Sequence, residues 1–277
     1  MGKEIKSKSE REYVLGTNDG ELSRLGLQHQ LWSEQTARAW ERAGFVSGQT
    51  LLDVGCGPGY ATFDLARLVG ERGEVIGIDQ SQRFIDQLDS QVRAQGARNI
   101  ATRLSDVEKI KLPRASVDGA FARWLLCFVK NPETVIAGVA RALKRGGTFV
   151  VLDYFNYEAV TIAPRHEIFR RFFRAVAESW RQRGGDPDVG CKIPTLMNRH
   201  GLEVREINSV VRIARPGSQF WQWPATFFDN YLPALMEMGL FNQADVRLFR
   251  REWKKRAHDP AAFFASPPMV EIIAVKR

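Results

Sequence analysis

The chain has few cysteines and lacks long apolar runs, and both features narrow its class. It contains three cysteines in 277 residues, a small odd number that argues against a disulfide framework, so we expect reduced thiols. No apolar stretch reaches the length needed to cross a membrane. Residues 1–11 are rich in charge and lack the apolar segment of a signal peptide, so we expect a cytoplasmic protein.

Several ligand-binding motifs are also missing. The glycines of residues 55–59 are spaced Gly-x-Gly-x-Gly, whereas the dinucleotide fingerprint requires Gly-x-Gly-x-x-Gly. No Gly-Lys-Ser/Thr follows them to hold a triphosphate. After the expected fourth strand the chain has neither an Asn/Asp-Pro-Pro-aromatic motif for a base nor a Pro-Cys nucleophile nor a clear acid cluster for magnesium. We therefore expect no metal and regard a nucleic-acid substrate as unlikely.

The formal net charge of +8 leaves an enzyme that acts on RNA open as an alternative, because basic proteins often bind phosphates. Arginines gather in residues 165–183 and 247–256, but acids intervene between them. In residues 165–174 the apolar side chains fall on one helical stripe, so the arginines are typical of a solvated helix face.

What the sequence contains is a series of buried strands alternating with helices. Strands are expected at residues 51–54, 74–79, 100–106, 117–123 and 147–153, the last preceded by a turn at residues 144–147, and helices at 62–70 and 82–95. This order predicts an α/β fold, a doubly wound Rossmann-like sheet of seven mostly parallel strands. The length and the 44% hydrophobic content fit one such domain with additions.

The first strand leads into the pattern Asp/Glu-x-Gly-x-Gly-x-Gly, filled by Asp53, Gly55, Gly57 and Gly59. Glycines at such a strand-to-helix turn let the backbone approach a ligand closely. The pattern resembles motif I of the class I S-adenosylmethionine (SAM)-dependent methyltransferases. The resemblance implies SAM as cofactor and S-adenosyl-L-homocysteine (SAH) as product. The expected cofactor-binding residues are Tyr13, Asp53, Gly55, Cys56, Gly57, Gly59, Asp79, Gln80, Ser105, Asp106, Val107 and Arg123.

Two further carboxylates follow later strands of the expected sheet. Asp79 ends the second strand about twenty residues after the glycines, where an acid accepts hydrogen bonds from ribose hydroxyls. Asp106 follows the third strand, and the resemblance implies a contact with the adenine amino group. Alternatively, Asp79 is a helix N-cap, a role that Ser81 could also fill, and Asp106 is an Asx-turn residue. Three acids at successive strand ends favour the ligand site.

Residues 13–28 resemble the N-terminal lid helix of a small-molecule subgroup of these enzymes, with an aromatic-x-Leu-Gly opening followed by Arg-Leu and Gln. The helix is expected to begin at residues 18–20. By this resemblance Tyr13 closes over the methionine end of SAM, and Gln28 and His29 face the pocket. The alternative for Tyr13 is ordinary surface packing.

These signals divide the chain into four parts. They are N-terminal lid helices at 1–45, the SAM-binding Rossmann-like core at 46–157, a helical cap insert at 158–200 and sheet-closing strands at 201–277 with an aromatic-rich helical insert at about 216–266. Most aromatics of that insert are expected to be packing, and the remainder to line an apolar substrate pocket. We expect a monomer or a homodimer.

The predicted activity is methyl transfer to oxygen, nitrogen or sulfur of a small, apolar or aromatic molecule. Such an in-line displacement depends mainly on proximity and alignment. A general base is optional, and His29, His166 and Asp153 are the weak candidates, each with an alternative role as a surface or capping residue.

Two alternatives to this activity stay open. Cys56, Cys127 and Cys191 fall near the regions where arsenite methyltransferases place thiolates, which suggests a metalloid or thiol S-methyltransferase. Alternatively, Cys56 is a small buried side chain of the core, and Cys127 is a buried, unreactive thiol. The second alternative is a non-catalytic SAM-binding protein or an RNA methyltransferase.

Overall fold

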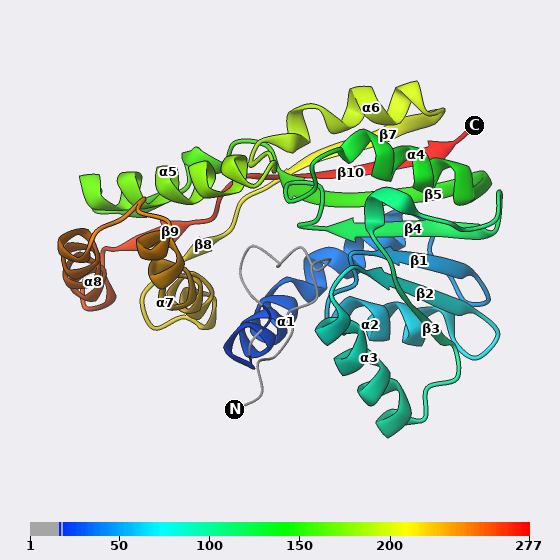
Figure 1. The fold of residues 1–277 in the computed structure, drawn as a ribbon, viewed down its shortest axis with the longest axis horizontal. Coiled ribbons are helices and arrows are strands. Elements are labelled where there is room, and N and C mark those ends of the chain that lie inside the picture. Colours follow the sequence, from blue (N-terminus) through cyan, green and yellow to red (C-terminus); the bar gives the residue numbers. More distant parts are fainter. Residues whose placement is uncertain (1–16, 18) are drawn as a thin grey trace, which may run out of the picture.

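The computed structural model describes residue 17 and residues 19–277, so Tyr13 lies outside the described residues. Figure 1 shows a twisted sheet with helices on both faces and a helical cap beyond one end. The seven strands have the order β3-β2-β1-β4-β5-β10-β7, and all neighbours are parallel except those of β10. The doubly wound, mostly parallel sheet predicted from the sequence is confirmed. Its strands are β1 Thr50–Val54, β2 Glu74–Asp79, β3 Ile100–Leu104, β4 Val117–Arg123, β5 Leu143–Tyr154, β7 Leu202–Val210 and β10 Met269–Lys276.

The strand β5 begins four residues earlier than expected. The turn expected at residues 144–147 lies inside it, with Gly146 at φ 80°. There the register with β4 shifts between Val117 and Gly119. A local irregularity that keeps strand pairing on both sides therefore replaces the expected turn.

Alternating side chains of the strands enter two separate cores, as the two-residue period of a strand requires. Leu51 packs with Leu65 and Trp40 on one face, whereas Leu52 packs with Val135 and Val139 on the other. The first face is covered by α2 Tyr60–Val69 and α3 Gln82–Gln95, and the second by α4 Pro132–Ala142 and α6 Ile193–Arg199. Burial on both faces explains why the central strands are continuous apolar runs.

The N-terminal helix α1 Asp19–Arg42 begins within the range 18–20 expected from the sequence. It runs from the cap to the sheet (Figure 1). Its Trp40 packs on Phe121 of β4, and Trp32 is fully buried against Trp124 and Trp223. The helix is therefore part of the core at its C-terminal half.

The cap is formed by α5 Glu167–Gln182, α7 Gln222–Glu237 and α8 Gln243–Ala257, together with a small antiparallel sheet. The strands of this sheet, which the sequence did not predict, are β6 Thr161–Ala163, β8 Ile213–Ala214 and β9 Phe263–Ala265. The four short 3-10 helices of the described residues are η1 Val107–Lys109, η2 Tyr157–Ala159, η3 Val189–Cys191 and η4 Gln219–Trp221.

Phenylalanines form the interior of this cap. Phe172 of α5 is fully buried, and its ring contacts those of Phe228 on α7 and Phe249 on α8. Of the expected insert at 158–200, α5 lies in the cap, whereas α6 packs against β7 and α4. We propose that the cap is one unit built from two stretches of chain.

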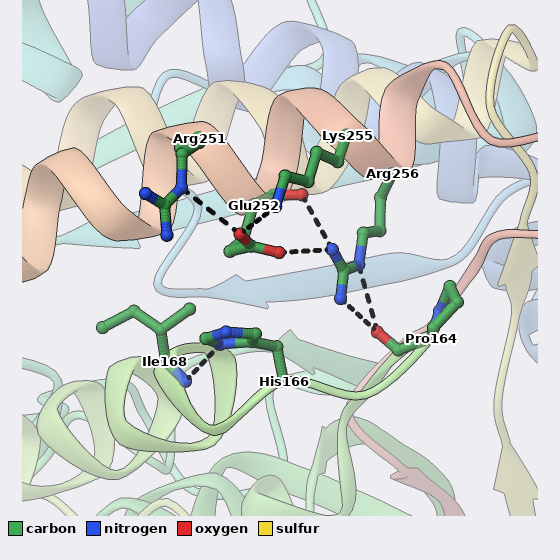
Figure 2. A network of polar contacts seen from close by, with 7 residues as sticks. All are labelled: Pro164, His166, Ile168, Arg251, Glu252, Lys255 and Arg256. Atoms are coloured by element: carbon green, nitrogen blue, oxygen red, sulfur yellow. Dashed lines mark hydrogen bonds and ion pairs between the residues drawn. The ribbon is translucent and has the colours of Figure 1, made fainter.

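A polar network joins α8 to the turn before α5 (Figure 2). The Glu252 carboxylate accepts hydrogen bonds from Lys255 Nζ at 2.7 Å and Arg256 Nη1 at 2.6 Å. Hydrogen bonds from Lys255 and Arg256 lower the pKa of Glu252 to about 2. Arg256 also donates from Nε and Nη2 to the Pro164 carbonyl oxygen at 3.1 and 3.0 Å. The nearby His166 accepts the Ile168 N–H through Nδ1 and caps α5.

Candidate functional site

The glycine loop after β1 presents open backbone at the carboxyl edge of the sheet. Gly55 and Gly57 have φ of 70° and 54°, in the left-handed region that favours glycine. A Cβ on Gly57 would meet no atom within 4 Å, whereas one on Gly55 would lie 2.6 Å from Leu125 Cδ1. The loop therefore leaves space beside Gly57 that a ligand can approach.

Gly59 has a different role from its two neighbours in the motif. It precedes α2 with φ 90°, and a Cβ there would lie 2.2 Å from Leu88 Cδ1. It is not among the residues that line the cavity beside the loop. Close packing of α3 on the loop explains this glycine.

A cavity with an empty volume of about 930 Å³ lies beside the loop. Residues of α1, β4 and the segment after β4 complete its wall. Most of the predicted cofactor residues line it, namely Asp53, Gly55, Cys56, Gly57, Asp79, Gln80, Val107 and Arg123. The sequence did not single out the apolar side chains Leu25, Phe84, Phe121, Leu125 and Val129, which also line it.

Asp79 is held at the end of β2 by backbone donors. Its Oδ2 accepts the Gly57 N–H at 2.9 Å, and its Oδ1 accepts the Ser81 N–H at 2.8 Å. Burial raises the pKa of Asp79, and these N–H groups counteract that rise. Each oxygen keeps a lone pair that can accept a further hydrogen bond. Ser81 caps α3, accepting the Phe84 N–H, so the N-cap role is filled without Asp79.

Asp53 lies at the base of the same cavity. It is 2% exposed and accepts a hydrogen bond from Thr62 Oγ1 at 2.7 Å. Burial raises its pKa to about 6, although the Thr62 hydrogen bond and the Arg123 charge act in the opposite direction. The carboxyl thus fixes the start of α2 relative to β1.

His29 and Arg123 form a chain of hydrogen bonds across the wall. Arg123 Nη2 lies 3.1 Å from His29 Nδ1, and His29 Nε2 lies 2.9 Å from Asp64 Oδ2. Because a guanidinium only donates, Nδ1 is the acceptor and Nε2 carries the proton toward Asp64. Burial lowers the pKa of Arg123 to about 10, which leaves it charged. Both His29 nitrogens are therefore occupied.

The segment after β3 contributes less than expected to the wall. Val107 lines the cavity, whereas Ser105 and Asp106 are not among its lining residues. Asp106 Oδ1 accepts the Glu108 N–H at 2.9 Å, which is the Asx-turn geometry weighed above. The proposed adenine contact of Asp106 stays a prediction.

A second cavity, with an empty volume of about 530 Å³, lies between the sheet and the cap. It is lined mostly by aromatic side chains of α5, α7 and the strand ends. The lining residues are Arg24, Gln28, Trp124, Phe128, Tyr154, Tyr157, Phe173, Trp180, Trp223, Pro224, Phe227, Phe228, Phe264 and Pro267. Gln28, Trp124 and Phe128 line both cavities, so the two spaces meet at these side chains.

Trp124 follows β4 directly and has φ 50°, a conformation that costs a non-glycine residue about 1–3 kcal/mol. Its Nε1 donates to Met269 Sδ at 2.8 Å, and its ring packs against Trp32 and Trp223. These contacts hold the indole at the junction of the cavities.

The cap-side face of α1 forms a polar wall, which contains Gln28 as expected and also Glu21 and Arg24, for which the sequence predicted no role. Glu21 and Arg24 are 0% and 4% exposed, and Arg24 donates from Nε and Nη2 to the two Glu21 oxygens at 2.7 and 2.6 Å. Arg24 Nη1 and Trp223 Nε1 both donate to Gln28 Oε1, each at 2.9 Å. In the sequence, the only indication of this wall is that Glu21, Arg24 and Gln28 have the spacing i, i+3, i+7, which places them on one face of a helix.

Asp153 is buried but does not line either cavity. Its Oδ2 accepts the N–H groups of Leu126 and Cys127 at 2.8 and 3.2 Å. Burial raises its pKa to about 6. The carboxyl shapes the loop after β4.

The three cysteines lie in different surroundings. Cys56 and Cys127 are buried, and Cys191 is exposed. Burial raises the thiol pKa of Cys56 and of Cys127 well above the ordinary value. Within residues 19–277, no three His, Cys, Asp or Glu side chains are grouped as a metal site requires. The thiols therefore do not form the cluster that the metalloid alternative needs.

The arginines of α5 are paired with acids. Arg170 lies 2.5 Å from Glu167, and Arg171 lies 2.9 Å from Asp245. Arg174 and Arg181 lie 3.4 and 3.7 Å from Glu158. This pairing agrees with a solvated helix face. Among the described helices, none is long and apolar enough to span a membrane.

Comparison with known proteins shows what this chain is similar to. Residues 52–151 match the family model described as a methyltransferase domain. The demethylmenaquinone methyltransferase of Lactococcus lactis is 30% identical over 126 residues, covering 46% of this chain and 49% of that protein. An uncharacterised 37.1 kDa protein of transposon TN4556 from Streptomyces fradiae is 31% identical over 176 residues, covering 62% and 49%. The chain thus spans about half the length of these curated relatives.

A solved structure is similar in fold over nearly the whole chain. The geranyl diphosphate C-methyltransferase of Streptomyces coelicolor A3(2) superposes with a TM-score of 0.59 at 15% identity, covering 99% of this chain and 88% of that one. At this identity the likeness concerns the fold.

Proposed function

We propose that this chain, which carries a methyltransferase domain of the class I SAM-dependent family, transfers a methyl group from SAM to a small, largely apolar molecule. The observation that supports this most directly is the junction of two cavities at Gln28, Trp124 and Phe128. One cavity has the acids and open glycines of a nucleoside site, and the other has aromatic walls. Methyl transfer requires the donor and the acceptor to be in contact, and such a junction allows that contact.

The residues of the first cavity suit SAM. Asp79 offers two oxygens with spare lone pairs at the end of β2, as ribose hydroxyls require. The open space beside Gly57 admits a ligand against the backbone. When bound, the sulfonium supplies an electrophilic methyl group and leaves as a neutral thioether. We propose that Gln80, Val107 and Phe84 of the cavity wall enclose the base.

The residues at the junction act mainly by position. Among the described candidate bases, His29 has both nitrogens engaged, His166 caps a cap helix, and Asp153 binds backbone N–H groups. We therefore propose that the acceptor atom attacks the methyl group without deprotonation by a base of the protein. Aromatic walls exclude water, and the strained Trp124 backbone holds the indole where the acceptor enters.

The acceptor atom is expected to be oxygen, nitrogen or sulfur, and the relatives add carbon. One relative is named for demethylmenaquinone, and the solved neighbour for carbon methylation of geranyl diphosphate. Demethylmenaquinone is largely apolar, whereas geranyl diphosphate joins an apolar prenyl chain to a charged diphosphate. Only the apolar parts of these molecules agree with the aromatic cavity. A metalloid acceptor is disfavoured because the three thiols lie apart.

The test is transfer of tritium from the labelled SAM methyl group to a panel of acceptors. The panel contains a naphthol, a thiophenol, an aromatic amine, a naphthohydroquinone and bulk RNA. Label in at least one small acceptor, with none in RNA, supports the proposal. Label in RNA, with binding that weakens steeply as salt rises, would show that the arginines form a phosphate track. Tight SAM binding with no transfer to any acceptor would favour the non-catalytic alternative.

A further inference from the structure

The aromatic cavity presents polar groups that have no partner among the described residues. Gln28 Oε1 accepts from Arg24 and Trp223, and both of those groups can only donate. The side-chain amide therefore cannot be rotated to exchange its oxygen and nitrogen. Its Nε2 has no acceptor among the described residues and is not fully buried, so it borders the cavities that Gln28 lines.

Two tyrosine hydroxyls border the same space. Tyr154 and Tyr157 line the aromatic cavity, and no described side chain or carbonyl hydrogen-bonds to either hydroxyl. Burial raises the pKa of both well above the ordinary value, and the charge of Arg24 partly offsets the rise. Both hydroxyls are thus protonated near neutral pH and can donate or accept.

Among the described residues, the lining of the aromatic cavity carries no excess charge. Arg24 is the one charged residue in the described lining, and its guanidinium is paired with Glu21 through two short hydrogen bonds. A buried anion such as a diphosphate would need an additional cation. The walls therefore suit a neutral molecule.

We propose that the aromatic cavity binds a neutral, planar aromatic acceptor whose ring oxygens are hydrogen-bonded by Gln28 Nε2 and by the Tyr154 and Tyr157 hydroxyls. The inference rests on the proposed function and specifies its substrate class. Gln28 is a specificity-determining residue, held in place by Arg24 and Trp223. An aromatic molecule without oxygens would leave these donors desolvated and unpaired, which penalises its binding.

Calorimetry with two probes tests the inference without SAM. 1-Tetralone and tetralin differ by one carbonyl oxygen, and the measured quantity is the ratio of their affinities. In Gln28→Leu, the preference for tetralone should fall roughly five- to tenfold relative to the wild type, the worth of one hydrogen bond. Gln30→Leu, on the exposed side of α1, is the matched control and should keep the wild-type ratio.

A second variant keeps the test valid if Gln28→Leu does not fold. Tyr157→Phe removes one oxygen and keeps the ring, and it should also reduce the preference for tetralone. An unchanged ratio in both folded variants, or no binding of either probe to the wild type, would overturn the inference. Binding of geranyl diphosphate more tightly than tetralone would overturn the neutral character of the site. Since no SAM is present, failure of methyl transfer would not alter these outcomes.

Discussion

Replacing Asp79 by asparagine probes the nucleoside end of the first cavity. The carboxylate already accepts the N–H groups of Gly57 and Ser81 at 2.9 and 2.8 Å, which leaves one lone pair on each oxygen for the ribose. Asparagine keeps one acceptor oxygen and loses the charge. One charge-assisted hydrogen bond is worth about 1.5–3 kcal/mol. SAH affinity should therefore fall roughly 10- to 100-fold.

Titration calorimetry of SAH into the folded variant measures this loss. Asp86→Asn, an exposed acid on α3 that bonds only Gln82 among the described residues, is the matched control and should bind as the wild type does. A difference of about twofold is within the error of such measurements. If a folded Asp79→Asn protein binds SAH within that error of the wild type, Asp79 does not contact the ligand.

Three other perturbations follow from the same structure. Gly57→Ala should lower the free energy of unfolding by about 1–2 kcal/mol because of the positive φ, and it should also weaken SAH binding. The control Gly96→Ala, at φ 63° with open space, should lose stability but not SAH affinity. Equal SAH affinity of the two variants would contradict the role of Gly57. Glu252→Gln should lower the free energy of unfolding by about 1–2 kcal/mol at pH 6. Since the pKa of Glu252 is lowered from 4.5 to about 2, the wild type loses its extra stability over the variant as pH falls from 4.5 toward 2. Denaturation at several pH values measures this loss, with Glu237→Gln as the exposed control. A stability difference that does not change with pH would refute the prediction. Deleting residues 1–28 removes Leu25 and Gln28 from the wall of the first cavity, so SAH binding by calorimetry should weaken strongly, and unchanged affinity would mean that this part of α1 does not shape the site.

The sheet could be predicted because its strands are buried on both faces. Residues 51–54 and 74–79 are apolar runs ending in a glycine loop and in an acid, and those signals are local. The small cap sheet could not be predicted, because β8 has two residues and β6 and β9 have three, too few for a period to appear. Its strands form through pairing between distant segments.

The site was predictable where the motif is contiguous. Asp53, Gly57 and Asp79 line the cavity as expected, although their roles toward a ligand stay proposals. The hydrogen bond between Gln28 and Trp223 joins residues 195 positions apart, and no local pattern encodes it. The left-handed backbone of Trp124 is likewise imposed by its packing, since a tryptophan does not favour that conformation.

A crystal structure of the protein with SAH tests the central claim most directly. The account predicts that the ribose of SAH lies within hydrogen-bonding distance of Asp79 and that the rest of the ligand passes beside Gly57. It also predicts that the sulfur points toward the junction at Gln28 and Trp124. Electron density for SAH outside this cavity, or a sulfur pointing away from the aromatic cavity, would contradict the account.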